Sequence, residues 1–110
     1  MTAFATPAAR RTLVRYTVKP GRDAENVEAI GRVFAELAHT APPGLRYAAF
    51  HDDTGLSFVH LVSHEGADGA DALRSLPAFQ AFRAGVAERC AAPPVATPLH
   101  GIGSYRLLGP

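Results

Sequence analysis

The stretch LRYAAFHDDTGLSFVHLVS, residues 45–63, decides the fold because it predicts two β-strands joined by a tight turn. Asp52, Asp53, Thr54 and Gly55 supply the turn chemistry, since Asp can hydrogen-bond to its own backbone and Gly can adopt a positive φ. A turn centred on these four residues pairs residue 51 with residue 56. Apolar side chains then occupy both faces, with Leu45, Tyr47, Ala49, Leu56, Phe58 and Val62 on one and Ala48, Phe50, Val59 and Leu61 on the other.

This double-faced hairpin predicts that both faces of the sheet are covered. An antiparallel hairpin in a small domain normally leaves one face in water. The helices of one small domain can cover the first face. We therefore expect a second copy of the chain to cover the other, as a homodimer.

Length and composition limit the possible functions. The 110 residues suit one domain, and 47% of them are hydrophobic. The net charge is +1 and the charges are spread along the chain, so a nucleic-acid partner is not expected. No apolar run approaches the ~20 residues of a membrane span. The single cysteine excludes an intramolecular disulfide and suits a reducing compartment, so we expect a cytoplasmic protein.

Hydrophobic periodicity predicts one strand and one helix before the hairpin. Residues 1–11 are expected to form a flexible tail, and residues 12–110 one domain. A strand is predicted over 12–19, where apolar and polar residues alternate. Asp23 is the predicted N-cap of a helix that runs to about residue 39 and keeps Glu36 off its apolar stripe.

A second helix and a last strand follow the hairpin. Pro77 suits the first turn of a helix, which Asp71 or Ser75 is expected to cap. The buried stripe of this helix is predicted to be Phe79, Phe82, Val86 and Cys90. Residues 91–98 are expected to form an irregular linker and residues 99–108 the final strand.

The order of elements is thus β-α-β-β-α-β, which predicts an α+β fold of the ferredoxin-like type. Right-handed crossovers place both helices on one face of a four-stranded antiparallel sheet. The other face is left for the partner.

Three segments in this order, VRYTVKPG, PPGLRYAAFHDDTGLSFVHLVS and ADALRSLPAFQAF, resemble the antibiotic biosynthesis monooxygenase family of dimeric α/β-barrel proteins. The resemblance covers about residues 13–107. It implies a homodimer whose two sheets close on each other. It also implies oxidation of an aromatic, quinol-like or polyketide-like molecule by molecular oxygen, in a pocket between sheet and helices, with no metal or flavin.

The chain departs from two patterns of that family. Members commonly carry histidines at the positions that Leu73 and Ala78 occupy here. The branch that degrades haem needs a pocket tryptophan and a histidine on the second helix, and this chain has neither. Haem degradation is therefore not expected.

Tyr47 and His60 are the candidate catalytic pair, because the predicted register makes them direct cross-strand neighbours. A phenol and an imidazole can bind a substrate hydroxyl and remove its proton. The alternative is a structural pair inside the barrel or the dimer interface. A change of one residue in register would place the two side chains on opposite faces.

Five further residues are candidates for binding substrate. Arg15 and Tyr16 lie on the first predicted strand, and Tyr105 and Arg106 on the last, and these strands are expected to be neighbours. An arginine there would stabilise a phenolate or an enolate. Phe58 shares the face of the candidate pair. The alternative is that such residues are edge or interface groups.

His51 and His64, with Asp52, Asp53 and Glu65 nearby, lack the spacing of a metal site, and no metal is expected. The expected function is cofactor-independent oxygenation of a small aromatic molecule. Tyr47 and His60 would orient and deprotonate it, and Arg15 or Arg106 would stabilise the anion. The alternative is a non-catalytic binding or assembly protein built on the same dimer.

Overall fold

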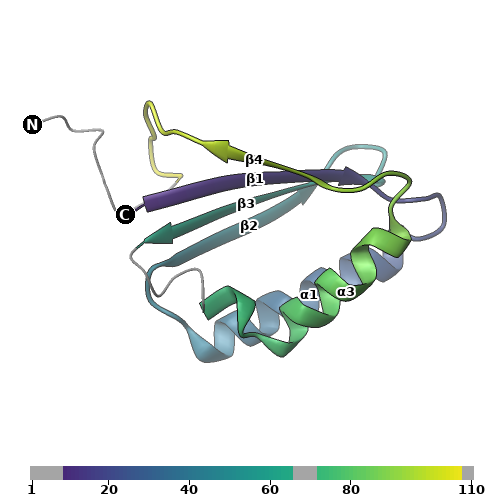
Figure 1. The fold of residues 1–110 in the computed structure, drawn as a ribbon, viewed down its shortest axis with the longest axis horizontal. Helices are drawn as coiled ribbons and strands as arrows, with labels where there is room; N and C mark the ends of the chain where they lie inside the picture. Colours follow the sequence, from purple (N-terminus) through teal and green to yellow (C-terminus); the bar gives the residue numbers. More distant parts are fainter. Residues whose placement is uncertain (1–8, 66–71, 108–110) are drawn as a thin grey trace, which may run out of the picture.

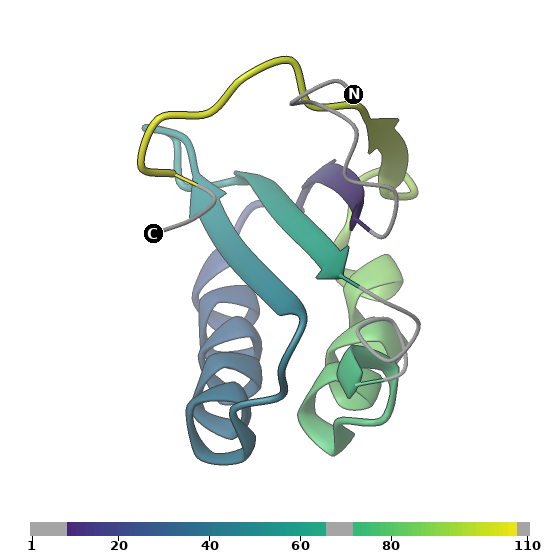
Figure 2. The same cartoon turned by 90° about the vertical axis from the view of Figure 1, so that its left-hand side faces the viewer.

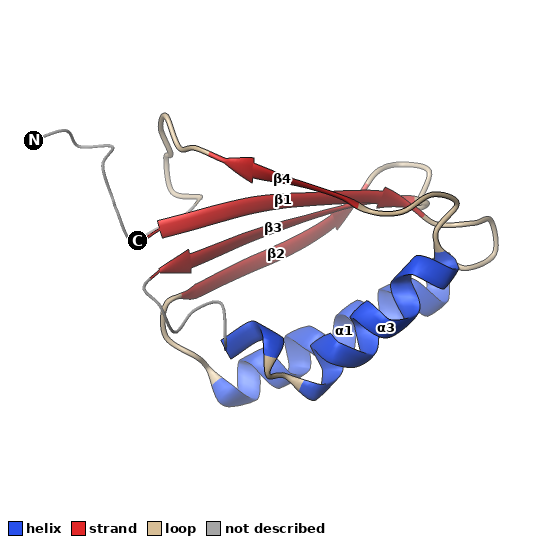
Figure 3. Ribbon diagram, in the orientation of Figure 1, coloured by secondary structure: helices blue, strands red, loops and turns tan. Residues whose placement is uncertain are grey.

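The computed structural model describes residues 9–65 and 72–107, which form a curved sheet with helices on one side (Figure 1). The elements in chain order are β1 (Ala9–Thr17), α1 (Asp23–Thr40), β2 (Leu45–His51), β3 (Ser57–Glu65), α3 (Pro77–Arg89) and β4 (Val95–Leu99). All strand pairs are antiparallel, in the order β2-β3-β1-β4. Figure 3 shows both helices on the same face of the sheet. The ferredoxin-like α+β fold predicted from the sequence is confirmed.

Strand β1 lies between β3 and β4 and differs from its prediction at both ends. It was expected over 12–19, and it covers Ala9–Thr17. Arg10 and Arg11 are part of the strand because they pair with His64 and Ser63 of β3. Pairing along the whole of β3 extends β1 into a segment without a clear alternating pattern. The predicted tail is therefore too long by at least three residues, and its residues 1–8 lie outside the described part of the chain.

The turn of the hairpin has the predicted chemistry. The Asp52 Oδ1 accepts a hydrogen bond from the Thr54 backbone N–H at 3.1 Å. The Gly55 N–H donates to the Asp52 carbonyl at 3.0 Å, and Gly55 has φ +76°. A positive φ of this size costs little at glycine, which has no Cβ.

The register of the hairpin differs from the prediction by two residues. The Asp52 N–H still donates to the Ser57 carbonyl at 3.0 Å, so the connection is formed by residues 53–56. As a result His51 pairs with Phe58, where a pair with Leu56 was expected. Because side chains alternate with a period of two, a shift of two residues leaves every side chain on its predicted face.

Helix α1 begins one residue before the prediction, with Asp23 as its first residue and Arg22 as the N-cap. Its buried residues are Asn26 and Val33, which lie seven positions apart on one face. The helix ends at Thr40, where Ala41 adopts a left-handed conformation and its N–H donates to the Leu37 carbonyl at 2.8 Å.

Helix α3 starts at Pro77, as predicted, but its cap comes from another helix. The N-cap residue is Leu76, which offers no side-chain acceptor, so the prediction for Ser75 is wrong. Asp71, the other predicted cap, lies outside the described residues. Glu36 of α1 supplies an acceptor, because its Oε1 lies 3.1 Å from the Ala78 N–H. Glu36 was expected to be a residue of the solvated face.

Strand β4 corrects the largest error of the sequence analysis. It was expected over 99–108, and it covers Val95–Leu99. Pro98 was taken to exclude a strand here, but β4 is an edge strand that pairs only with β1, and an edge tolerates a residue without N–H. The segment after β4 crosses the open face of the sheet (Figure 2). There Leu107 lies over a hollow that Phe50 and Leu61 also line.

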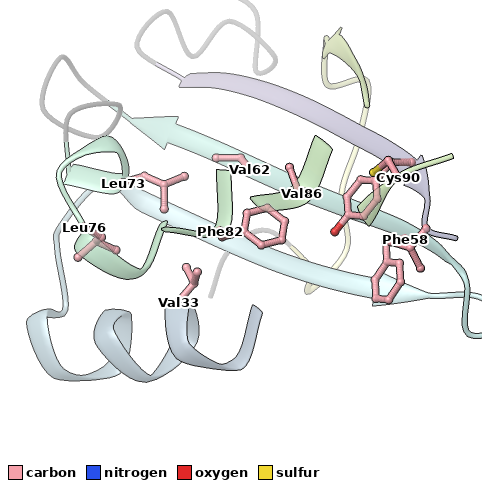
Figure 4. Close-up of a cluster of buried hydrophobic side chains, with 10 residues drawn as sticks. Val33, Phe58, Val62, Leu73, Leu76, Phe82, Val86 and Cys90 are labelled. Atoms are coloured by element: carbon pink, nitrogen blue, oxygen red, sulfur yellow. The ribbon is translucent and has the colours of Figure 1, made fainter. Parts of the chain in front are cut away.

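The hydrophobic core lies between the sheet and the helices. Figure 4 shows Phe58 and Val62 of β3 on one side of it and Phe82 and Val86 of α3 on the other. The predicted stripe of α3 is confirmed, with Cys90 buried and Phe79 packed at the edge of the core. The buried hydrophobic residues are Tyr16, Val18, Val33, Phe58, Val62, Leu73, Leu76, Phe82, Val86 and Cys90.

The opposite face of the sheet is largely apolar, and no helix in the described part of the chain lies on it. Phe50 of β2 is 54% exposed and Val95 of β4 is 51% exposed. Between these two edges the strand register places further apolar residues on this open face, which are Leu13, Ala48, Val59 and Leu61. In the described part of the chain, no helix is both long and apolar enough to cross a membrane.

Candidate active site

His60 lies at the centre of β3, faces the helices and is 2% exposed. Its Nε2 is 2.7 Å from the Tyr16 hydroxyl, and its Nδ1 is 2.7 Å from the Tyr47 hydroxyl. Both ring nitrogens are therefore hydrogen-bonded to phenols. The contact between Tyr47 and His60 is present, but the prediction that they are direct cross-strand neighbours is wrong, because Tyr47 pairs with Val62.

The strand register explains how one imidazole reaches two tyrosines. His60 is directly opposite Val14 on β1 and Ala49 on β2. The tyrosines are its diagonal neighbours, because Tyr16 is opposite Phe58 and Tyr47 is opposite Val62. The small side chains directly opposite leave space for the two long ones to bend towards the imidazole.

Aromatic rings surround this polar centre. The Phe82 ring lies 5.4 Å from the His60 ring, and the Phe58 ring stacks on Tyr16 at 5.5 Å between centroids. Phe34 of α1 stacks on Tyr47 at 5.0 Å. The imidazole and the two hydroxyls are thus held in an apolar environment that excludes most water.

This environment determines the protonation of all three groups. Burial disfavours the charged form of His60 and lowers its pKa to about 4. Burial likewise raises the pKa of Tyr16 to about 12 and the pKa of Tyr47 well above the ordinary value for tyrosine. At neutral pH the imidazole is neutral and both phenols keep their protons. One nitrogen of His60 therefore donates a hydrogen bond and the other accepts one.

Two residues that the sequence analysis missed extend this site towards α3. The Asn26 Nδ2 donates to the Tyr16 hydroxyl at 2.9 Å, and the Arg89 Nε donates to the Asn26 Oδ1 at 3.0 Å. Asn26 is completely buried and Arg89 is 5% exposed. A signal for both was present, since each occupies a stripe position of its helix, three or four residues from an apolar neighbour. We refer to Arg89, Asn26, Tyr16, His60 and Tyr47 as the buried polar chain.

The structure does not bring the other predicted residues together. Arg15 and Tyr16 are on opposite faces of β1, so Arg15 is exposed on the open face. Tyr105 is 80% exposed, and the guanidinium of Arg106 lies 5.0 Å above its ring. Tyr105 and Arg106 are not strand neighbours of Arg15, because residues 100–107 form no strand. Phe58 is 2% exposed and belongs to the core as well as to the site.

A surface groove reaches one end of the buried polar chain. It lies between the second half of α1 and the start of β2 and has a volume of about 330 Å³. Tyr47 is the only polar side chain among the residues that line it, which are Phe34, Leu37, Ala38, Ala41, Pro42, Leu45 and Tyr47. The groove thus combines apolar walls with the side chain of one tyrosine, whose hydroxyl contacts His60.

A second hollow, of about 360 Å³, opens at the other edge of the sheet. Tyr16, Phe58 and Arg15 are among its lining residues. The Tyr16 hydroxyl already accepts from Asn26 and contacts His60. Tyr47 is therefore the phenol of the chain that keeps hydrogen-bonding capacity for a ligand.

In the described ranges 9–65 and 72–107, no three His, Cys, Asp or Glu side chains lie close enough together to bind a metal ion. His51 is the last residue of β2 and its Nδ1 donates to the Asp52 carbonyl at 2.9 Å. The residues that are brought together are donors and acceptors of hydrogen bonds, in an arrangement that suits binding and stabilising an oxygen atom of a ligand.

Comparison with solved structures identifies the fold. Neither the family models nor the curated proteins that were compared match the chain. A protein of Nitrosomonas europaea named "Putative antibiotic biosynthesis monooxygenase" superimposes with a TM-score of 0.72, at 20% identity over 86% of this chain and 91% of that chain. A protein of Caulobacter crescentus with the same kind of name gives 0.73, at 18% identity over 89% and 93%.

A third similar structure carries a more specific name. SnoaB from Streptomyces nogalater, named a cofactor-independent oxygenase, gives a TM-score of 0.67, at 18% identity over 90% of this chain and 98% of that chain. The fold of the chain is thus that of the antibiotic biosynthesis monooxygenases, in agreement with the resemblance noted in the sequence.

Proposed function

We propose that this protein is a cofactor-independent oxygenase that acts on a small aromatic, quinol-like or polyketide-like molecule. One observation carries the proposal: a neutral imidazole is held between two tyrosine hydroxyls, and one of these tyrosines lines an apolar groove. The aromatic rings of the substrate would lie against Phe34 and Leu37, with an oxygen atom of the substrate at the Tyr47 hydroxyl.

The reaction needs a substrate that loses a proton. A CH₂ group between two aromatic rings, conjugated through those rings with a carbonyl, gives up a proton and forms a carbanion, whose charge is shared with the carbonyl oxygen. The carbanion reduces O₂, and the two combine to a hydroperoxide. Loss of water then leaves a new carbonyl group, so one oxygen atom enters the product and the other leaves as water.

Two roles are open to the site in the first step. In the first role, which was expected from the sequence, His60 removes the proton from the substrate. An imidazole whose pKa is about 4 holds a proton weakly, which weighs against that role at neutral pH. The geometry favours the second role, in which water at the open groove takes the substrate proton and later returns one to the peroxide, Tyr47 donates a hydrogen bond to the oxyanion and His60 positions Tyr47. Donors held in a fixed position stabilise the charge that develops on such an oxygen.

A second copy of the chain belongs to this proposal. The open face of the sheet presents Phe50 and Val95 to solvent, and monomeric proteins seldom expose a large apolar patch. Two such faces packed together would form the dimeric α/β barrel expected from the sequence. A cytoplasmic location is also proposed, because Cys90 is a buried free thiol that suits a reducing compartment.

The alternative function is non-catalytic binding of a small molecule on the same dimer. The tight packing around His60 and the absence of histidine at positions 73 and 78 favour it. Oxygen uptake distinguishes the two functions. A protein that only binds would not raise the rate of oxygen consumption for any substrate.

The test measures oxygen uptake with a panel of anthrones and hydroquinones. We expect the wild type to oxidise at least one anthrone, and Tyr47→Phe to lower kcat by about 10² to 10³, the usual loss for one oxyanion donor. Tyr105→Phe is the matched control, because this exposed tyrosine is outside the sheet, and its kcat should equal that of the wild type. Wild-type uptake no faster than buffer with every substrate would overturn the proposal.

A further inference from the structure

Arg89 is a buried cation with few partners. Its Nε donates to Asn26 at 3.0 Å, and its Nη1 is 3.9 Å from a carboxylate oxygen of Glu25. Its Nη2 is buried and has no hydrogen-bond partner in the described part of the chain. The guanidinium also lies 5.6 Å above the ring of Phe82. Burying a charge with so little compensation costs stability, so packing alone does not account for it.

The fold makes room for this cation. A Cβ atom on Gly85, one turn earlier in α3, would lie 2.6 Å from the Arg89 Nη1. Gly85 is inside the helix, where glycine lowers stability relative to alanine. Two features that lower the stability of the fold, a glycine inside a helix and a buried charge, thus lie at the same place.

Arg89 determines the orientation of the Asn26 amide. All nitrogen atoms of a guanidinium donate hydrogen bonds and none accepts. The atom of Asn26 that faces Arg89 must therefore be its oxygen, and the amide NH₂ must face Tyr16. The Tyr16 hydroxyl then accepts from Asn26.

The orientation of the Asn26 amide determines the direction of each hydrogen bond in the buried polar chain as far as Tyr47. With the Tyr16 oxygen accepting from Asn26, its own proton is free to donate to the His60 Nε2. A neutral imidazole that accepts at Nε2 carries its proton at Nδ1, so His60 donates to the Tyr47 oxygen. The proton of the Tyr47 hydroxyl is then left to donate to a group outside the buried polar chain.

We propose that Arg89 and Asn26 are positioning residues that fix the direction of the buried polar chain, so that Tyr47 offers its O–H to an oxygen anion in the groove. This inference rests on the proposed function, which places a phenolate or an enolate there. The cation at the inner end polarises each hydrogen bond in the same direction, which strengthens the last donor. The substrate class is therefore one that binds as an oxygen anion.

The tautomer of His60 tests the direction of the chain without any substrate. Long-range ¹H–¹⁵N NMR spectra distinguish a protonated from an unprotonated ring nitrogen. We expect wild-type His60 to be predominantly the Nδ1–H tautomer. In Asn26→Asp, the carboxylate can only accept, so the Tyr16 hydroxyl would donate to it. The hydrogen bonds from Tyr16 to Tyr47 would then reverse their direction, and His60 would become predominantly the Nε2–H tautomer.

A second variant removes the cation. In Arg89→Met the Asn26 amide is free to turn over, and we expect both His60 tautomers to be populated. Arg83→Met is the matched control, since Arg83 is exposed on the same helix and contacts only the Phe79 ring among the aromatic groups described. Its His60 should remain the Nδ1–H tautomer. Should Arg89→Met fail to fold, Asn26→Asp still decides, because it keeps size and places a carboxylate next to the guanidinium.

Two results would overturn the inference: an Nε2–H tautomer in the wild type, or an Nδ1–H tautomer that persists in Asn26→Asp. Failure of the proposed function is a separate result. If the tautomers change as expected but no anthrone or hydroquinone raises oxygen uptake, the chain has the inferred direction and the protein is not an oxygenase for these compounds. If uptake is observed and the tautomers do not change, the oxygenase stands and the positioning role of Arg89 and Asn26 is wrong.

Discussion

His60 makes the stability of the protein sensitive to acid. Its pKa is about 4 in the folded protein, whereas a histidine in the unfolded chain has a pKa of about 6.5. Between these two values the unfolded state binds the extra proton, so the free energy of unfolding falls as the pH falls. The stability is fully present above pH ~6.5 and is lost through pH ~4. The loss is on the order of 3 kcal/mol, from 1.36 kcal/mol for each pKa unit.

The first prediction is that replacing this imidazole makes the free energy of unfolding depend less on pH below pH 6.5. Urea unfolding of the wild type should show a free energy that drops between pH 6.5 and pH 4. His60→Gln, which cannot titrate, should be less stable at pH 7 and lose much less over the same interval. His51→Gln, at the exposed end of β2, should reproduce the wild-type curve. Parallel curves for wild type and His60→Gln would show that another group causes the acid sensitivity.

Among the residues of the buried polar chain, the sequence predicted one contact and missed two residues, Asn26 and Arg89. The Tyr47 and His60 contact was predictable because strand alternation survives a register error of two residues. Asn26 and Arg89 were not, because periodicity tells which positions are buried but not which buried polar groups meet. The hydrogen bond from Arg89 to Asn26 joins α3 to α1 across 63 positions of sequence.

The helices are joined by a cap that one helix provides for the other. The first turn of α3 contains no acidic residue, and the Glu36 carboxylate of α1 accepts from the Ala78 N–H. A carboxylate at a helix N-terminus satisfies a free N–H group and interacts favourably with the helix dipole. Glu36 therefore stabilises the packing of α1 against α3.

The second prediction is that Glu36→Ala destabilises the protein by about 1 kcal/mol, the usual loss for an N-terminal cap. Glu36→Gln keeps an acceptor without the charge and should lose less. Glu28→Ala is the control on the same helix, where an exposed pair with Arg32 should contribute no more than about 0.5 kcal/mol. Urea midpoints compare the three variants. Equal midpoints for Glu36→Ala and Glu28→Ala would show that the cap contributes nothing.

Elements were predictable where periodicity was regular and uncertain where proline interrupted it. The hairpin and both helices follow clear apolar patterns, and their positions agree within about two residues. Strand β4 was missed because residues 93, 94 and 98 are prolines, which are excluded from central strands but not from an edge. The position of a strand in the sheet is a tertiary property that its own sequence does not contain.

Within residues 9–65 and 72–107, both long helices cover one face of the sheet and no helix covers the other. The order of the elements was enough to predict this, because right-handed crossovers place both helices together. The open face is bounded by exposed Phe50 and Val95. A second copy of the chain is the partner that the proposed dimer places there.

The third prediction is a dimer in solution. Light scattering on a size-exclusion column should give a mass twice the 11.6 kDa of one chain. Phe50→Arg places a charge on the open face and should yield a monomer or a weaker dimer. Val27→Arg is the matched control, because Val27 is 48% exposed on α1, and this variant should remain dimeric. A wild type with the mass of one chain would contradict the proposed barrel.

Oxygen incorporation is the direct test of the proposed oxygenase function. An anthrone is oxidised under ¹⁸O₂ with wild-type protein, with Tyr47→Phe and without protein, and the product is analysed by mass spectrometry. We expect one ¹⁸O atom in each product molecule. The wild type should form the labelled product about 10² to 10³ times faster than Tyr47→Phe does. Labelled product that forms at the same rate with and without the protein would contradict it.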